Sequence, residues 1–464
     1  MNRLSSQNRK LVYLGLIVLL LIPVIWLGRP ADSAQTSSGG VLAQLRNKHK
    51  LGETTLGDVD PSSATMNLVL LGMRGVATNV LWLEHDDFKT KKDWPKMRAA
   101  AKSIILLQPH YLQVWRYQGW DLAYNVSAEW DLVKDRYYWV KEGGKFTMEG
   151  AKQNSLLPEL YWDVGRILGQ KVGRSDEWQY FRKYFKEDPD PKFTKNGIKG
   201  PDPEFARDPS RAIKDDDNYL CAKEWYFRAN EAEAAGQRQH IMMKMLFRQY
   251  PARSQFDYAD ALQRDGGNNA FTERSRLAWD EAYDDWTTKY RNGKPGFGKE
   301  EWESPGGTII LEADDSVIRE LARKDSISET DKRKWVDQYQ KTSNYRFWRL
   351  KAQFEREPIT VKAHQEIAEG QRLFKDGRHR EAIDMLQQGM ADYARALANY
   401  VELVDEDLTL EEGLMAMIYW RYALRLLDLP VPEQHPLKAL EDKQKDRVPD
   451  IERRFRQENG IQQN

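Results

Sequence analysis

Residues 361–393 of this chain read VKAHQEIAEGQRLFKDGRHREAIDMLQQGMADY, and this stretch predicts two helices joined by a tight turn. Gly377 accepts the positive φ angle that ends a helix, so the first helix is expected to stop there. Ala382 has a small side chain, which lets the second helix approach the first. Because such a pair cannot bury its apolar faces alone, the stretch predicts further helix pairs packed beside it and an all-α fold.

The same stretch resembles the tetratricopeptide repeat, a unit of about 34 residues made of two antiparallel helices. Glu366 departs from the family, which has a tryptophan at that position. The resemblance implies a solenoid of helical hairpins. The residues at the family's signature positions are Gly370, Leu373, Gly377, Ala382, Leu386 and Gly389.

A second stretch with this resemblance covers residues 86–124, where Pro109 aligns with the late proline of the unit. Trp94 then falls at the start of a second helix, and Lys92 replaces the usual turn glycine. The next unit begins with the family's tryptophan, small and large positions, and the same spacing recurs once more downstream. These residues are Trp115, Gly119 and Leu122, followed by Tyr161, Gly165 and Leu168.

An uncharged apolar run, Leu11–Leu27, stands near the start of the chain. As a helix it would reach about 26 Å, enough to cross the core of a bilayer. We therefore expect a single transmembrane anchor in residues 1–28 that contacts lipid through residues 11–27, with a cleaved signal peptide as the alternative. The positive-inside rule places the N-terminus in the cytoplasm and the body outside it, in the periplasm or another extracytoplasmic space. The positive charges that flank the run, on which this orientation rests, are Arg3, Arg9 and Lys10 before it and Arg29 after it.

Residues 66–83 predict a helix of the soluble core, because apolar residues recur at three- and four-residue spacing. Arg74 on this helix is expected to pair with a carboxylate. The segment LGMRGVATNVLWLE, residues 71–84, also resembles one that bacterial membrane-anchored helical-repeat proteins carry before their first repeat. The predicted buried face consists of Met66, Leu70, Met73, Ala77, Val80 and Leu81.

Composition changes along the chain predict its domain organisation. The segment 186–218 is rich in Pro, Asp and Gly and divides two helical lobes. The expected parts are the anchor (1–28), a polar tether (29–62), a first helical-repeat lobe (63–185), a loop or linker (186–218), a second helical-repeat lobe (219–440) and a charged tail (441–464).

Composition and motifs exclude several classes of function. Among 464 residues, 71 Lys and Arg balance 71 Asp and Glu, so no basic excess indicates a nucleic-acid partner. The single cysteine, Cys221, excludes internal disulfides and all paired-cysteine motifs. The phosphate loop, the dinucleotide fingerprint and the serine-hydrolase elbow are absent from the sequence. We therefore expect no catalytic residue, no cofactor and no metal.

His85 is flanked by Glu84, Asp86 and Asp87, which raises the question of a metal site. Residues adjacent in sequence point around a helix instead of converging on one point. A solvated helix face is therefore expected at His85.

The densest aromatic cluster runs from Trp115 to Trp139. Trp120 and Tyr124 are four residues apart and share a helix face, with Arg136 close by in sequence. One interpretation is a partner-binding face made by Trp120, Tyr124 and Arg136. The other is packing between successive repeats, which requires the same spacing.

The resemblance implies a function as a membrane-tethered helical-repeat scaffold that binds other proteins or peptides outside the cytoplasm. A curved stack of helix pairs leaves a concave face for such a partner. An alternative is a cell-envelope enzyme acting on glycan or lipid through carboxylates that the sequence does not single out. A structural assembly subunit, which would expose large apolar patches, is a third possibility.

Overall fold

The structure is a computed structural model, and it describes residues 10, 13–17, 19–20, 22–23, 74–195, 197–206, 217–236, 239–266 and 270–461. Within these ranges the chain is mostly helical, and its only strands form two short antiparallel hairpins. The all-α class predicted from the sequence is therefore confirmed. Contacts within the chain divide it into two compact units, residues 1–240 and 241–464.

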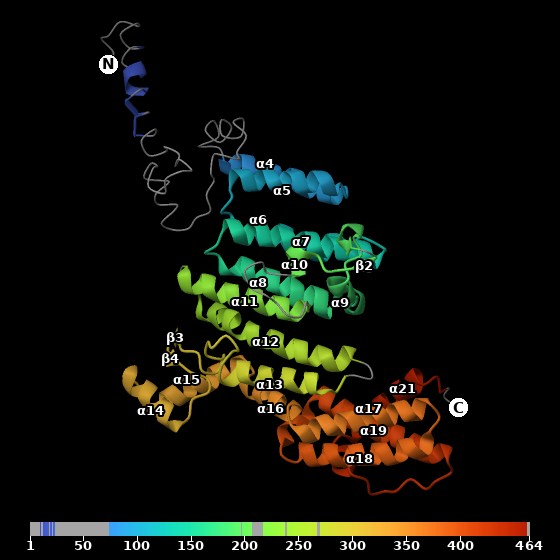
Figure 1. Cartoon of the computed structure of the whole chain (residues 1–464). Coiled ribbons are helices and arrows are strands. Elements are labelled where there is room, and N and C mark those ends of the chain that lie inside the picture. Colours follow the sequence, from blue (N-terminus) through green and yellow to red (C-terminus); the bar gives the residue numbers. More distant parts are fainter. Residues whose placement is uncertain are drawn as a thin grey trace. The chain divides into compact units, whose positions relative to one another are not determined.

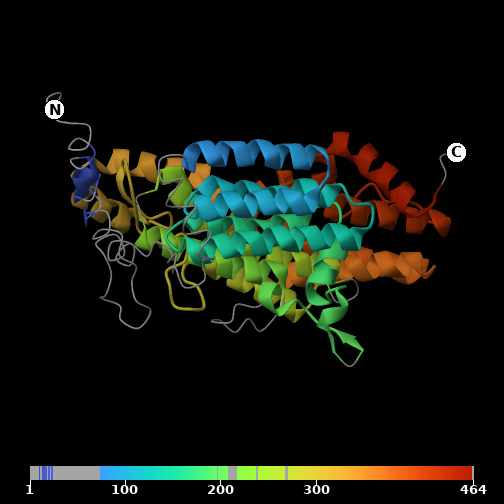
Figure 2. The same cartoon turned by 90° about the horizontal axis from the view of Figure 1, so that it is seen from above.

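Helices of the first unit pack against one another in chain order (Figures 1 and 2). Helix α4 (Arg74–Thr90) lies against α5 (Trp94–Leu107). Helix α6 (Leu112–Asp121) continues through the π-helical segment η1 (Leu122–Val126) and packs against α7 (Val133–Gln153). The helix start predicted at Trp94 is confirmed.

The next helix, α8 (Pro158–Arg166), also continues through a π-helical segment, η2 (Ile167–Val172). Helix α8 packs mainly against α11 (Asn218–Ala235). The sequence predicts α11 as part of the second lobe, and the predicted domain bounds stay a prediction. The chain between η2 and α11 forms short elements: α9 (Trp178–Lys186), η3 (Pro191–Phe193), β1 (Thr194–Lys195), β2 (Ile198–Lys199) and α10 (Pro203–Ala206).

The second unit starts with α12 (Ile241–Asp265), which packs against α13 (Glu273–Thr287). Helix α13 then packs against α16 (Tyr345–Glu355), and α17 (Pro358–Lys375) forms an extensive interface with α18 (His379–Leu397). The remaining elements are β3 (Trp302–Ser304), β4 (Gly307–Ile309), α14 (Asp315–Lys324), α15 (Glu329–Thr342), η5 (Val401–Asp405), α19 (Asp407–Leu426), α20 (Lys438–Lys443), η6 (Lys445–Arg447) and α21 (Val448–Glu458).

The helix pair predicted in residues 361–393 is confirmed by α17 and α18. A Cβ atom on Gly370 would lie 2.5 Å from Cγ of Leu386, so the helices touch where the glycine stands. Ala382 is fully buried in the same interface, which belongs to a hydrophobic core of this unit. Small residues therefore set the distance between the two helices.

Helix α17 ends in a Schellman turn at the predicted residue. Gly377 has a φ of +75°, and its N–H donates to the carbonyl of Phe374 at 3.1 Å. The N–H of Arg378 donates to the carbonyl of Leu373 at 2.9 Å, which completes the pattern.

Helix α4 also ends in a Schellman turn, in which Lys92 occupies the left-handed position with a φ of +56°. The N–H of Lys92 donates to Lys89, and the N–H of Asp93 donates to Phe88. A residue with a Cβ is strained here by about 1–2 kcal/mol. The lysine that departs from the family pattern thus adopts the backbone conformation that the glycine would have.

Among the described residues, no helix combines the length and the apolar character needed to cross a membrane. The predicted anchor, residues 11–27, is described only in pieces, and the tether lies outside the described residues, so both stay predictions. Within α4, the predicted buried face is wrong at Val80, which is 50% exposed. The side of α4 that its neighbours cover carries Thr78 and His85, both buried.

A buried imidazole joins three helices of the second unit. His364 on α17 places Nδ1 2.6 Å from Glu412 on α19 and Nε2 3.2 Å from Glu355 on α16. Burial alone would lower the pKa of His364, but the two carboxylates raise it to about 10. Burial would raise the pKa of Glu355, and the charge on His364 instead holds that pKa below its usual value. The group is therefore an imidazolium between two carboxylates.

We predict that Lys92→Gly stabilises the first unit by about 0.5–1 kcal/mol, because glycine removes the strain of a left-handed residue. The loss of the exposed ion pair between Lys92 and Glu129 offsets only part of that gain. Urea unfolding of the purified full chain measures the effect. Lys91→Gly, one residue earlier and at negative φ, is the control and is expected to destabilise; equal effects of the two variants would contradict the prediction.

His364→Gln is expected to destabilise the second unit by about 3 kcal/mol at pH 6, since it leaves the buried carboxylate of Glu355 and the partly exposed carboxylate of Glu412 without their cation. The pKa of His364 is higher in the folded protein than in the unfolded chain, so its stabilisation is complete below about pH 6.5 and is lost as the pH rises towards 10. Unfolding of wild type and variant at pH 6, 8 and 10 should show the difference shrinking. A difference that stays constant with pH would sink this account.

Candidate partner-binding face

A continuous series of ring contacts joins α4 to α6 and η1 in the first unit. Trp82 on α4 lies 5.6 Å from Tyr117 on α6, which lies 6.3 Å from Trp120. Trp120 stacks on Tyr124 of η1 at 6.0 Å and an interplanar angle of 22°. We call these four residues the aromatic ladder. Tyr117 is exposed and the other three are half-buried, so the ladder is open to solvent.

The predicted pair of Trp120 and Tyr124 therefore shares a face, as their spacing requires. Tyr124 lies within a π-helical segment, a geometry that is frequent at functional sites. Burial raises the pKa of Tyr124 above its ordinary value, and the positive charge of Arg166 opposes that rise. The phenol thus stays neutral beside its cationic neighbours.

Two cations lie over the ring of Tyr124 at one end of the aromatic ladder. The guanidinium of Arg166 lies 5.9 Å from the centre of the Tyr124 ring, and the ammonium of Lys171 lies 5.4 Å from it. Lys171 also lies 5.9 Å from the ring of Phe181 on α9. Contacts of this kind stabilise a cation by about 0.5–2 kcal/mol.

Within the described part of the chain, Lys171 forms no ion pair and its ammonium has no hydrogen-bond acceptor. Burial lowers its pKa, and the nearby charge of Arg136 adds to that effect while Glu177 opposes it. A half-buried ammonium held by two rings is thus left to satisfy its donors with solvent or with a ligand.

Arg136, the third predicted residue, lies at the start of α7 and is committed to protein contacts. Its Nε donates to the carbonyl of Trp130 at 2.6 Å, and its Nη1 to Glu177 at 2.5 Å. Burial would raise the pKa of Glu177, but the bond from Arg136 lowers it. Arg136 therefore orients Glu177 near Lys171 and does not stack with the ladder.

Near the Trp82 end of the aromatic ladder, the ammonium of Lys89 donates to Asp121 at 2.5 Å and to the hydroxyl of Tyr117 at 3.2 Å. His85, expected on a solvated face, is fully buried, and that expectation is wrong. Its Nε2 lies 2.5 Å from Oε1 of Gln118, because α6 covers this side of α4. Among the described residues, no group of three His, Cys, Asp or Glu could hold a metal ion.

The close approach of α6 and α7 holds the ladder in place. A Cβ on Gly143 would lie 2.5 Å from the carbonyl oxygen of Gly119 and 2.7 Å from the backbone nitrogen of Ala123. Trp115 is buried in the same interface and donates to the carbonyl of Pro109 at 2.9 Å. The predicted small and large positions of this repeat are thus packing positions, and they leave Trp120 and Tyr124 on the open side.

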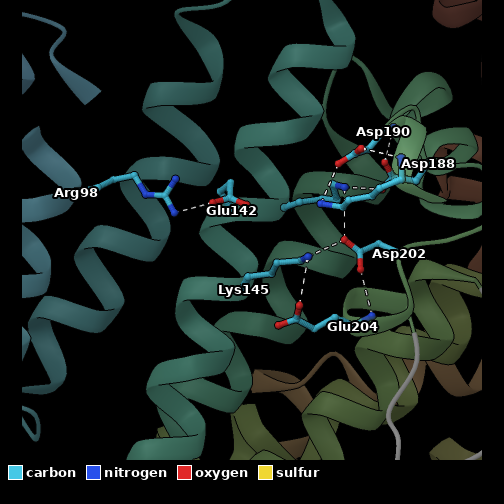
Figure 3. A network of polar contacts seen from close by, with 9 residues as sticks. Arg98, Glu142, Lys145, Asp188, Asp190, Asp202 and Glu204 are labelled. Carbon is cyan, nitrogen blue, oxygen red and sulfur yellow. Dashed lines mark hydrogen bonds and ion pairs between the residues drawn. The ribbon is translucent and has the colours of Figure 1, made fainter. Parts of the chain in front are cut away.

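A network of buried ion pairs holds the segment after α9 against α7. Helix α9 itself carries Phe181, the second ring beside Lys171. Lys141 on α7 lies 2.5 Å from Asp188, and both side chains are at most 5% exposed. Lys145 lies 2.7 Å from the buried Asp202 and 3.4 Å from Glu204 (Figure 3). The segment expected as a loop or linker is therefore tied to α7 by paired charges.

Comparisons of this chain with models of known protein families, with curated proteins and with solved structures found no match. The face is therefore defined by its own geometry alone. Sequence reasoning missed Arg166 and Lys171. Aligning the recurring spacing at Tyr161, Gly165 and Leu168 with that at Trp115 would have placed Arg166 at the register of Trp120 and Lys171 next to that of Tyr124.

We predict that Gly143→Ala destabilises the first unit by about 1–3 kcal/mol, since the added methyl would meet backbone atoms that cannot rotate away. Gly75→Ala on α4 is the matched control, because a Cβ there has nothing within 4 Å. That control is expected to be neutral or stabilising by up to about 1 kcal/mol. Thermal unfolding of both variants tests this, and an unaltered melting temperature for Gly143→Ala would refute the close contact.

Proposed function

We propose that this protein is a membrane-tethered helical-repeat scaffold that binds a protein or peptide partner outside the cytoplasm. The observation that carries the proposal is the aromatic ladder, because tyrosine, tryptophan and arginine side chains are enriched where proteins bind proteins. Four rings, one on α4 and three along α6 and η1, form a track that an extended segment can follow. Lys171 supplies donors for that segment.

The proposed architecture is a solenoid of tetratricopeptide-like hairpins. Helix packing in chain order supports it, as do the matching turns at Lys92 and Gly377. The recurring spacing that begins at Trp115 and at Tyr161 ends in each case within a π-helical segment. In such an architecture the first helices of each pair line one face, which is where the ladder lies.

The proposed membrane localisation rests on the sequence. The apolar run at residues 11–27 is long enough for a bilayer, and the charges flanking it favour a cytoplasmic N-terminus. A tethered scaffold gains local concentration at the membrane, which strengthens otherwise weak contacts with partners held on the same surface.

A photo-crosslinking amino acid tests the face directly. Placed at position 117 within the ladder of the full chain in native membranes, it should capture a partner that mass spectrometry identifies. Placed at position 111, an exposed tyrosine outside the ladder, it should not. Trp120→Ala and Tyr124→Ala should each reduce the captured adduct at least tenfold, because each removes a stacked ring.

Tyr111→Ala is the matched control and should leave capture unchanged. All variants should keep the helical circular dichroism of wild type, which separates lost binding from lost folding. Folded ladder variants that capture the partner as well as wild type does would overturn the proposed face.

A further inference from the structure

A hollow of about 380 Å³ lies in the second unit and is bounded by α13, the end of α16 and the turn into α17. Its volume falls in the range of sites that hold small molecules. The aromatic ladder belongs to the first unit, and the proposed function does not use this hollow. The polar residues that line it are Arg276, Asp280, Tyr283, Gln353, Arg356 and Glu357.

The charges around the hollow are paired within the protein. Nε of Arg356 lies 3.2 Å from one oxygen of Asp280, and Nη1 of Arg276 lies 3.7 Å from the other. Arg276 also donates through Nε and Nη2 to both oxygens of Glu273. Asp280 therefore stands between two guanidinium groups, in the place that a bound anion would take. The same two guanidinium groups repel a cation, so a neutral ligand is favoured.

Hydrogen-bonding capacity, in contrast, is left over around the hollow. Counting contacts to all residues that the structure describes, the carboxylate of Asp280 accepts no hydrogen bond and the Nη atoms of Arg356 donate none. Over the same residues, the side-chain amide of Gln353 and the hydroxyl of Tyr283 make none either. All four side chains are half-buried, so these donors and acceptors are available to whatever fills the hollow.

Neighbouring contacts hold these groups in place. The guanidinium of Arg356 lies 4.2 Å from the centre of the Tyr283 ring. Glu357, the next residue, accepts a hydrogen bond from the hydroxyl of Tyr400. The donors and acceptors are thus oriented before a ligand arrives, which lowers the entropic cost of binding.

We propose that this hollow binds a neutral polyhydroxylated ring, that is, a sugar. A hydroxyl group both donates and accepts hydrogen bonds. Neighbouring hydroxyls of a sugar can therefore donate to Asp280 while they accept from Arg356 and Gln353. The bonds to the two charged groups are charge-assisted and are the stronger ones. The same chemistry occurs in a free sugar and at the end of a glycan chain.

Titration by saturation-transfer NMR on the full chain in lipid nanodiscs tests the proposal with methyl β-D-glucopyranoside as the probe. The probe should bind at least tenfold more tightly than 2-methoxytetrahydropyran, which has the same ring without hydroxyls. It should also bind more tightly than glucose 6-phosphate, because Asp280 repels an anion. Equal binding of the probe and the hydroxyl-free ring, or tighter binding of the phosphate, would overturn the proposal.

Asp280→Ala should weaken binding of the probe at least fivefold and should make glucose 6-phosphate the tighter ligand, because it uncovers two guanidinium groups. Asp284→Ala, one turn further along α13 and outside the hollow, is the matched control and should leave both affinities unchanged. A folded Asp280→Ala variant that binds the probe as wild type does would place the sugar elsewhere and refute the site.

Gln353→Leu removes the amide, keeps a similar shape and touches no charge, so it tests the site without disturbing the ion pairs. It should weaken binding of the probe at least threefold, and unchanged binding would also refute the site. Cellohexaose distinguishes the two sources: competition with the probe assigns the hollow to the ends of glycan chains, and no competition assigns it to free sugars.

Discussion

Close approach between paired helices is the constraint on which both units depend. An amphipathic hairpin gains little stability by itself, because its apolar faces need a second helix and then a neighbouring pair. Gly143 against Gly119 in the first unit and Gly370 against Leu386 in the second show how the approach is achieved. Small residues bring the helices together, and large residues such as Trp115 then fill the space beside them.

Buried cations also hold neighbouring segments together within each unit. Lys141 ties residues 187–206 to α7, and Lys332 donates to the carbonyls of Gly306 and Thr308 and so fixes the β3–β4 hairpin. His364 joins α16, α17 and α19 in the same way. Each of these cations has its partners within the protein. Lys171 differs, because its ammonium meets two aromatic rings and no acceptor among the described residues.

The sequence predicts what depends on local spacing and misses what depends on which faces meet. The turn at Gly377 and the shared face of Trp120 and Tyr124 follow from spacing, and both are confirmed. The burial of His85 depends on α6 covering α4, which no pattern within α4 reveals. The cations of the candidate face were missed for the same reason, since their contact with Tyr124 joins separate helices.

The first unit also bears the cost of a long connection between α8 and α11. Roughly 45 residues separate Val172 from α11, the helix on which α8 packs, and closing such a loop costs about 2 kcal/mol more than closing a four-residue turn. Two features offset this cost. Gly165 and Gly173 admit the rings of Tyr226 and Tyr219 from α11 at close range, and paired charges order the intervening chain on α7. This connection carries Phe181, which lies beside Lys171, so the same segment also completes the cationic end of the ladder.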